Sequence, residues 1–272
     1  MIRFDHVHKR FADGTVAVED FSLEVPSHRV GVLLGSSGCG KTTLLRMVNR
    51  MVDPTSGSVW IDDDNVADLD PVALRRRIGY VMQSAGLLPH RTVADNVATV
   101  PLLAGVDRRT AHRRARELLE LVGLDAGTLA RRYPSQLSGG QRQRVGVARA
   151  LASDPNILLM DEPFGAVDPV VRADLQRELQ RIQADLGKTI VFVTHDVDEA
   201  FLLGDEILVL RTGARVAQAG TAEQIMARPA DPFVAEFIGG ARRRLHTEPR
   251  DGALAVIDAD GRLTGYAERW AD

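Results

Sequence analysis

The pattern of hydrophobic and polar residues predicts short strands through the first part of the chain. Apolar residues either alternate with polar ones or form a short uninterrupted run, as half-buried and fully buried strands do. The predicted strands are Ile2–Val7, about Val16–Val25, Val30–Leu34, Val59–Ile61 and Ile78–Met82. After Lys41 the apolar spacing changes to that of a helix, which we expect to continue until Asp53-Pro54 stops it.

From about Ser84 to Ala152 the pattern becomes helical. The segment Thr110–Val122 carries arginines on one face and leucines on the other, which predicts an amphipathic helix. Strands and helices then alternate: the predicted elements are the strand Ile157–Met160, the helix Val170–Leu186, the strand Thr189–Thr194, the helix Val197–Leu203 and the strand Ile207–Leu210. This alternation predicts an α/β fold with a mostly parallel sheet covered on both faces, interrupted by a helical insertion.

Composition narrows the functional classes. The 272 residues are 44% hydrophobic and 26% charged with a net charge of −3, so we expect a globular protein that does not bind nucleic acid. The single cysteine, Cys39, excludes an intramolecular disulfide and a cysteine-based zinc site. No apolar run reaches the roughly 18–20 residues of a membrane-spanning helix, so we expect any role at a membrane to come through a partner subunit.

A glycine-rich segment between a predicted strand and a predicted helix is the strongest chemical signal. Gly35–Thr42 fits the pattern G-x-x-x-x-G-K-[ST], in which glycines turn backbone N–H groups toward phosphate oxygens at a helix N-terminus. Lys41 is placed to reach the outer phosphates and the Thr42 hydroxyl to ligate Mg²⁺. The expected ATP-binding residues of this loop are Gly35, Ser36, Ser37, Gly38, Cys39, Gly40, Lys41, Thr42 and Thr43. Its cysteine is an expected target of thiol reagents.

Two adjacent acids end a later apolar strand. Asp161 would present a carboxylate to the water shell of the metal, and Glu162 would orient or deprotonate the attacking water. Taken alone, the pair could be a helix cap or two surface acids. Because it follows a phosphate loop on an α/β chain, the metal-binding interpretation is favoured.

A second candidate phosphate site lies at the start of a helical segment. Leu137–Gln141 reads Leu-Ser-Gly-Gly-Gln, with Ser138 as a helix N-cap and two glycines that leave helix N–H groups open to an anion. A solvated linker is the alternative, although the helix predicted over Arg142–Leu151 favours a phosphate site. One chain cannot easily fold two such helix ends onto one nucleotide, so we expect a composite site shared between two copies.

These motifs, in this order, resemble the nucleotide-binding subunit of ABC transporters over about residues 1–240. The resemblance implies a P-loop NTPase with a RecA-like core, an N-terminal antiparallel β subdomain and an inserted α-helical subdomain. The core would comprise residues 1–83 and 153–240, and the helical subdomain about residues 84–152. The residues implied to contact ATP of the other copy are Ser138, Gly139, Gly140, Gln141 and Asp168.

The resemblance also implies roles for single residues. Gln83 would contact Mg²⁺ and the attacking water and report to a membrane partner, although read alone it would be an exposed loop amide. His195 would touch the γ-phosphate, which makes Glu162, His195 and Gln83 the expected catalytic residues. Asp168 would lie at the dimer seam while also able to cap the following helix. Phe11 would stack on adenine, with a core aromatic as the alternative.

Several stretches are more specifically similar to importer ATPases for quaternary amines. They are Thr15–Val18, Met47–Met51, Pro54–Gly57, Asp70-Pro71, Leu74–Tyr80 and Asp161–Pro169. This similarity implies uptake of an osmoprotectant such as glycine betaine, carnitine, choline or proline. Departures from the usual pattern occur at Ser36, at Ser84–Gly86 and at Val167, and none of them removes a catalytic group.

The resemblance further implies an assembly. We expect a homodimer that binds ATP and Mg²⁺ on the cytoplasmic side of the cell membrane, attached through permease subunits and served indirectly by an extracytoplasmic substrate-binding protein. Residues 241–272 would be a short tail, in which Leu254–Tyr266 reads as one strand-turn-strand and resembles a remnant of a CBS-like module.

Three other functions remain open from the sequence. An ABC protein of DNA repair or the ribosome usually carries two cassettes, long coiled-coil insertions or zinc motifs, and none appears here. An ATP sensor without turnover is disfavoured by Glu162 and His195. An exporter would share the same motor residues.

Overall fold

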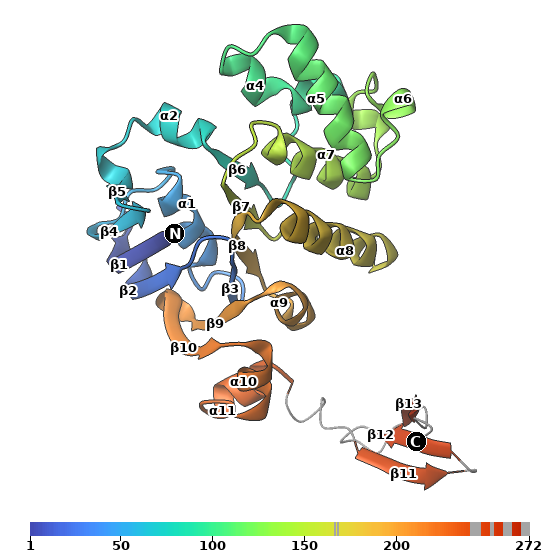
Figure 1. The fold of residues 1–272 in the computed structure, drawn as a ribbon. Helices are drawn as coiled ribbons and strands as arrows, with labels where there is room; N and C mark the ends of the chain where they lie inside the picture. Colours follow the sequence, from blue (N-terminus) through green and yellow to red (C-terminus); the bar gives the residue numbers. More distant parts are fainter. Residues whose placement is uncertain (166, 168, 240–245, 251–252, 258–262, 268–272) are drawn as a thin grey trace. The chain divides into compact units, whose positions relative to one another are not determined.

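The computed structural model describes residues 1–165, 167, 169–239, 246–250, 253–257 and 263–267 (Figure 1). Contacts divide the chain into two compact units, Met1–Thr221 and Ala222–Asp272. Among the described residues, no helix combines the length and the apolar character that crossing a membrane requires.

A six-stranded sheet forms the centre of the first unit. Its strand order is β10-β9-β3-β8-β7-β6, with every neighbouring pair parallel except β9 and β10. The strands are β3 (Val30–Gly35), β6 (Ile78–Val81), β7 (Ile157–Asp161), β8 (Thr189–Thr194), β9 (Glu206–Arg211) and β10 (Arg215–Gly220). Every residue of β3, β7 and β8 is buried, as expected of strands covered on both faces. Strand β10 was not predicted.

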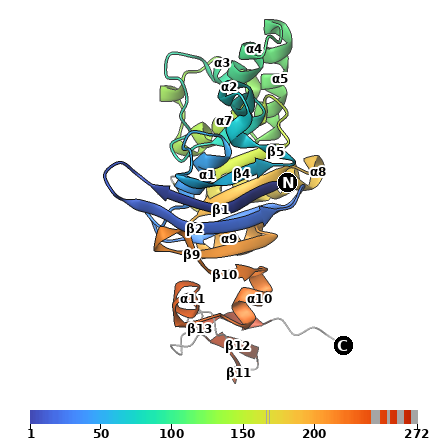
Figure 2. The ribbon, with the colours of Figure 1, turned by 90° about the vertical axis from the view of Figure 1, so that its left-hand side faces the viewer.

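A second, antiparallel sheet has the order β2-β1-β4-β5 (Figure 2). Its strands are β1 (Ile2–Arg10), β2 (Val16–Val25), β4 (Ser56–Ile61) and β5 (Asp64–Asn65). Inward-facing aromatic rings hold it to the core: Phe4 and Phe21 meet edge to face with ring centroids 5.3 Å apart, and both are almost fully buried. This sheet is the N-terminal antiparallel subdomain that the resemblance implied.

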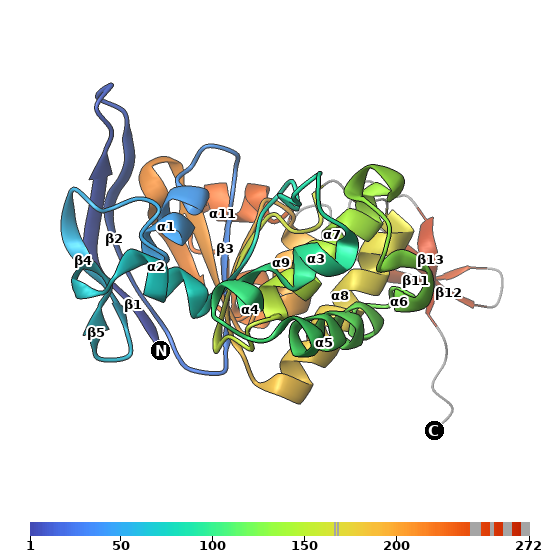
Figure 3. The same ribbon diagram turned by 90° about the horizontal axis from the view of Figure 1, so that it is seen from above.

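Helices cover the two faces of the central sheet. Helix α1 (Lys41–Val48) lies between the antiparallel sheet and the central sheet, whereas α9 (Val197–Leu203) packs on β3 and β8 and against α8 (Pro169–Leu186) (Figure 3). The prediction that the first helix continues to Asp53-Pro54 was wrong. The chain leaves the helix at Asn49, and Arg50 takes a left-handed φ of 52°.

The helical insertion follows β6. It contains α3 (Val93–Val97), α4 (Thr99–Leu103), α5 (Arg108–Leu121), α6 (Ala126–Leu129) and α7 (Gly139–Leu151), and a short helix α2 (Pro71–Arg76) precedes β6. Helix α5 buries one stripe of side chains, Ala111, Ala115, Leu118 and Leu119, which confirms the predicted amphipathic helix. Helix α7 contacts α3, α5 and β6, so it connects the insertion to the central sheet.

The second unit contains two short helices and a small sheet. The elements are α10 (Ala222–Ala227), α11 (Pro232–Phe237), β11 (His246–Arg250), β12 (Ala253–Ile257) and β13 (Leu263–Ala267). Strands β12 and β13 pair antiparallel, which confirms the predicted strand-turn-strand, and β11 adds a third strand that the sequence did not predict. The predicted boundary after residue 240 falls inside this unit and stays a prediction.

Candidate active site

The carboxyl ends of four parallel strands bring the predicted chemistry together at one edge of the central sheet. Strand β3 ends at Gly35 and leads into the glycine-rich loop, β7 ends at Asp161, and β8 leads to His195. Strand β6 ends two residues before Gln83. Ligands of open α/β sheets bind outside this edge.

The glycine-rich loop has a left-handed backbone at two of its glycines, and one of them leaves no room for a side chain. Gly38 and Gly40 have φ of 78° and 115°, and a Cβ added to Gly40 would lie 2.4 Å from the carbonyl oxygen of Ala17. Ser36 to Gly38 are exposed, so the backbone of the loop faces solvent there. Such a loop before a helix N-terminus fits a phosphate group.

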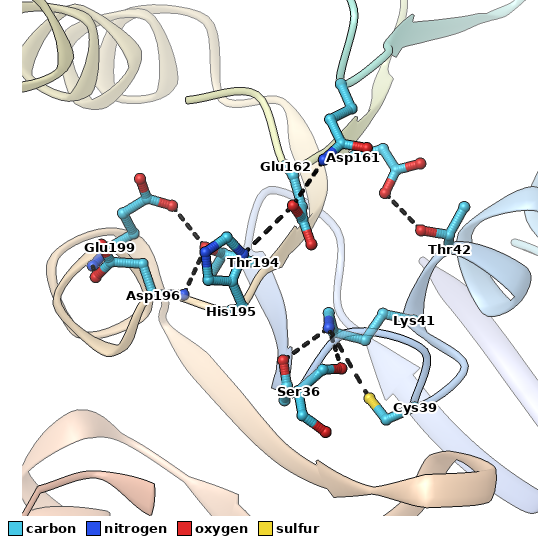
Figure 4. Close-up of polar contacts among 12 residues, drawn as sticks. Ser36, Cys39, Lys41, Thr42, Asp161, Glu162, Thr194, His195, Asp196 and Glu199 are labelled. Atoms are coloured by element: carbon cyan, nitrogen blue, oxygen red, sulfur yellow. Dashed lines mark hydrogen bonds and ion pairs between the residues drawn. The ribbon is translucent and has the colours of Figure 1, made fainter. Parts of the chain in front are cut away.

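Lys41 lies inside this loop. Its ammonium donates hydrogen bonds to the carbonyl oxygens of Gly35, at 2.7 Å, and Ser36, at 2.8 Å, and the residue is only 4% exposed (Figure 4). The loop therefore holds a buried cation where the sequence predicted a phosphate partner. Cys39 is 1% exposed, which contradicts the expectation that its thiol is a target for reagents.

Thr42 and Asp161 form a pair of oxygen groups next to the loop. The Thr42 hydroxyl donates to Asp161 Oδ1 at 2.8 Å, and Asp161 is 6% exposed (Figure 4). The Tyr80 hydroxyl lies 3.4 Å from Asp161 Oδ2, and burial raises the pKa of Tyr80, so it stays a donor. A hydroxyl beside a carboxylate is the oxygen chemistry that Mg²⁺ prefers. The sequence did not single out Tyr80.

The carboxylate of Glu162 is where three predicted catalytic residues meet. The Gln83 amide donates to Glu162 Oε2 at 3.0 Å. His195 Nδ1 lies 3.3 Å from the same oxygen (Figure 4). Glu162 has a left-handed φ of 44°, and its N–H donates to Val193 O at 2.9 Å. Gln83 is exposed, as a loop amide would be, and its side chain also contacts the candidate base Glu162. The exposed-amide interpretation and the catalytic interpretation are therefore compatible.

Leu137–Gln141 occupies a helix start, as predicted. Ser138 caps α7: its Oγ accepts from Gln141 N at 3.2 Å, and Gln141 Oε1 accepts from Ser138 N at 3.0 Å. Ser138 and Gly139 are exposed, whereas Gly140 is buried. Among the described residues, no hydrogen bond or ion pair joins this segment to the glycine-rich loop of the same chain.

Phe11 and Asp168 are the two remaining residues predicted to contact ATP. Phe11 is 39% exposed, with Lys9 Nζ 5.3 Å from its ring centroid, so it is not a core aromatic. Its stacking on adenine stays a prediction. Asp168 lies outside the described residues.

A set of polar residues that was not predicted from the sequence surrounds His195. Asp196 caps α9 with its side chain, Thr194 donates to the buried Glu199 at 2.6 Å, and Arg172 of α8 reaches both acids. The spacing of Asp196 and Glu199 at a helix start was a signal for an N-cap. Nothing in the local pattern indicated Arg172, which comes from another helix.

A family model described as ABC transporter matches residues 18–165, more than half of the chain. The chain belongs to the ABC transporter family. The choline transport ATP-binding protein OpuBA of Bacillus subtilis (strain 168) is 48% identical over 242 residues, 89% of this chain and 63% of that protein. The glycine betaine uptake system ATP-binding protein YehX of Escherichia coli (strain K12) is 49% identical over 239 residues, 88% of this chain and 77% of that protein.

Solved structures agree with this ABC-family assignment. The dimeric structure of a post-hydrolysis state of the ATP-binding cassette MJ0796, bound to ADP and Pi, matches with a TM-score of 0.74 at 33% identity. The match covers 81% of this chain and 98% of that one. The predicted α/β P-loop NTPase fold is thereby confirmed, as is the resemblance to quaternary-amine importer ATPases. The ABC-family chain spans 63% of the length of OpuBA.

Proposed function

We propose that this chain is the ATP-binding and ATP-hydrolysing subunit of an importer for a quaternary amine osmoprotectant. The observation that carries the proposal is the convergence of Gln83 and His195 on Glu162 beside the Thr42–Asp161 pair, at the mouth of the glycine-rich loop. The names of the relatives, which include choline and glycine betaine transport, support the cargo class.

The glycine-rich loop would hold the phosphates of ATP. Gly38 and Gly40 have left-handed backbones, and at Gly40 a side chain would meet the carbonyl oxygen of Ala17. A glycine-rich turn before a helix N-terminus would direct backbone N–H groups toward an anion. Lys41 would exchange its two carbonyl partners for phosphate oxygens. Phe11, exposed at the end of β1, would stack on the adenine.

Thr42 and Asp161 would hold Mg²⁺, Thr42 directly and Asp161 through water, with Gln83 as a further contact. When bound there, Mg²⁺ would neutralise charge on the phosphates. Glu162 would accept a proton from, or orient, the attacking water, and His195 would contact the γ-phosphate. The catalytic contribution of these residues is positioning and electrostatic stabilisation.

A second copy would complete the site. Ser138–Gln141 begins α7, with Ser138 and Gly139 exposed, and this helix start would suit the phosphates of a nucleotide held by another chain. Asp168 would lie at the same seam. The dimeric structure of the cassette MJ0796 bound to ADP and Pi supports a pair of cassettes. The head-to-tail arrangement and its closure by ATP are part of the proposal.

Transport would come through partners. Permease subunits would anchor the dimer to the cytoplasmic side of the membrane and receive its motion through the Gln83 loop and the helical insertion. A substrate-binding protein outside the membrane would supply the solute. Nucleic acid has no place in this proposal.

The first test is Glu162→Gln in the purified chain. Removing the carboxylate at which Gln83 and His195 converge should abolish phosphate release while ATP binding persists, because Lys41 and Thr42 are untouched. The variant should also elute as an ATP-dependent dimer in size-exclusion chromatography. Near-normal hydrolysis by this variant would overturn the proposed site.

The cargo needs a separate test. Uptake of labelled glycine betaine, choline, carnitine and proline at high osmolarity should fall in cells that lack the gene. Unchanged uptake of all four would remove the proposed cargo and leave the ATPase intact.

A further inference from the structure

Arg172, near the start of α8, contacts two other segments of the chain, the loop at Val167 and the start of α9. Its guanidinium donates to Val167 O at 3.3 Å and to Asp196 Oδ2 at 3.3 Å, and its Nε lies 3.8 Å from Glu199 Oε1. The first contact is to the loop that follows Glu162, and the other two are to the start of α9. One side chain therefore ties the loop after the candidate base to the helix after His195.

The two residues flanking His195 are both fixed by this set of contacts. Thr194 Oγ1 donates to Glu199 Oε2 at 2.6 Å and accepts from Asp196 N at 3.0 Å. Asp196 Oδ1 accepts from the N–H groups of Asp198, at 2.8 Å, and Glu199, at 3.2 Å. His195 lies between these anchors, 3.3 Å from Glu162 (Figure 4). Its backbone has little freedom to change direction while they hold.

The side chains of Arg172 and Asp196 are each 30% exposed, whereas their neighbour Glu199 is buried. Glu199 is 5% exposed in its side chain, and Arg172 Nε is buried with no hydrogen-bond partner among the described residues. A cavity of about 30 Å³ lies between them, lined also by Glu162 and His195. Because a buried carboxylate without a nearby cation is costly, the positions of Arg172 and Glu199 depend on each other.

We infer that Arg172 is a positioning residue, which holds His195 toward Glu162 by linking the loop at Val167 to Asp196 and Glu199. The inference rests on the proposed ATPase function. An arginine suits the role because its planar guanidinium has five donors and can reach acceptors on both segments. A lysine would keep the charge but could not span them.

The expected kinetic signature follows from this geometry. Arg172 touches neither the glycine-rich loop nor Thr42, so its loss should leave ATP binding in place. Misplacing His195 by a fraction of its contact distance should slow the chemical step, by about 10- to 100-fold in kcat. Arg172→Lys should recover little of this loss.

The experiment compares Arg172→Gln, Arg172→Lys and Asp196→Asn in the full-length purified chain. Asparagine caps helices as well as aspartate, so Asp196→Asn removes the ion pair and preserves the start of α9. Arg177→Gln is the matched control, because Arg177 lies on the same helix with its side chain 72% exposed, paired only with Asp174 among the described contacts. For each variant, kcat, KM for ATP and the thermal midpoint are measured.

We expect both Arg172 variants and Asp196→Asn to lose kcat with KM nearly unchanged, and Arg177→Gln to match the wild type. The double variant Arg172→Gln/Asp196→Asn is measured as well. If Arg172 acts through Asp196, it should be no slower than the slower of the two single variants, because the effects are then not additive. Additive losses, a wild-type rate in Arg172→Gln, or full activity in Arg172→Lys would overturn the inference.

Failure of the proposed function gives a different result. If the wild-type chain releases no more phosphate than Glu162→Gln, the ATPase assignment falls and the inference falls with it. If the wild type hydrolyses ATP and only the Arg172 result is negative, the assignment stands and this inference alone is wrong.

Discussion

Glu162 adopts a left-handed backbone conformation, with φ of 44°, where the side chains of Gln83 and His195 converge. A residue with a side chain pays about 1–3 kcal/mol for such a backbone, so the surrounding contacts must hold it there. The hydrogen bond from Glu162 N to Val193 O is one of them. Stored strain of this kind is typical of catalytic positions and supports the proposed role of the residue.

Glu199 should make the stability of the folded chain depend on pH. Burial raises the pKa of Glu199 above its usual value near 4.5, and Asp196 adds to the rise, while Thr194, Arg172 and His195 oppose it. The folded chain therefore binds this proton more tightly than the unfolded chain does. Its contribution to stability is fully present below about pH 4.5 and is lost as the pH rises through the folded-state pKa.

Glu199→Gln should remove that dependence, because an amide does not titrate. The free energy of unfolding, measured with urea between about pH 4 and pH 8, should fall less with rising pH in the variant than in the wild type. Parallel curves for the two proteins would show that burial of Glu199 has no such effect.

Whether a site residue could be predicted depended on whether its role shows in the neighbouring sequence. Lys41, Thr42 and Asp161 were predictable because each sits at a fixed place in a strand-loop-helix pattern. Tyr80 and Arg172 were not predictable, because their partners lie on strands and helices remote in sequence. The burial of Cys39 was missed because no local pattern indicates which loop side chains turn inward.

Helix α7 combines two roles at the scale of an element. Its first turn begins at the exposed Ser138 and Gly139. Its last turn carries the half-buried Arg149, whose guanidinium donates to the carbonyls of Ala85 and Gly86 at 2.6 Å each. Those carbonyls belong to the loop that begins with Gln83. A movement of α7 toward a second copy would therefore act directly on that loop.

Ser138→Ala tests how much the cap contributes to α7. Losing the hydrogen bond from Gln141 N should cost about 1 kcal/mol and lower the thermal midpoint by about 2–4 °C. Ser138→Asn, which retains an N-cap, should restore the midpoint. Equal midpoints for the two variants would mean that the cap adds nothing, and a dimerisation defect shared by both would place Ser138 at the nucleotide.

Helix ends were the least predictable part of the elements. The first helix ends at Val48, although its apolar spacing continues to Met51. Met51 N and Val52 N both bond to Arg46 O, which closes the chain into a turn where a straight helix would continue. Backbone closure of this kind depends on what packs nearby and leaves no trace in periodicity.

At the scale of the molecule, all described residues of the candidate site lie in the unit Met1–Thr221. A chain that ends at residue 240 should therefore hydrolyse ATP at a rate comparable to the full chain, as the predicted boundary requires. The measurement is steady-state phosphate release, and the rate of Glu162→Gln in the full chain serves as the background without hydrolysis. Loss of hydrolysis in the shortened chain would assign the tail to the ATPase domain, and a chain ending at 221 would locate the boundary.

Local patterns were sufficient for the fold class and the phosphate loop. Alternation of strands and helices, and a glycine-rich turn before a helix, reflect short-range sterics and hydrogen bonding that neighbouring residues decide. They also indicated a second phosphate-binding helix start at Ser138.

Long-range packing decided the rest. The order of strands in the sheet brings Asp161, from β7, to Thr42 at the start of α1, 119 positions earlier, and brings Gln83 to Glu162. The link from Arg172 to Asp196 and Glu199 exists only because α8 packs against α9. Such contacts depend on which buried surfaces fit together, and that selection is made by the whole core and not by any one segment.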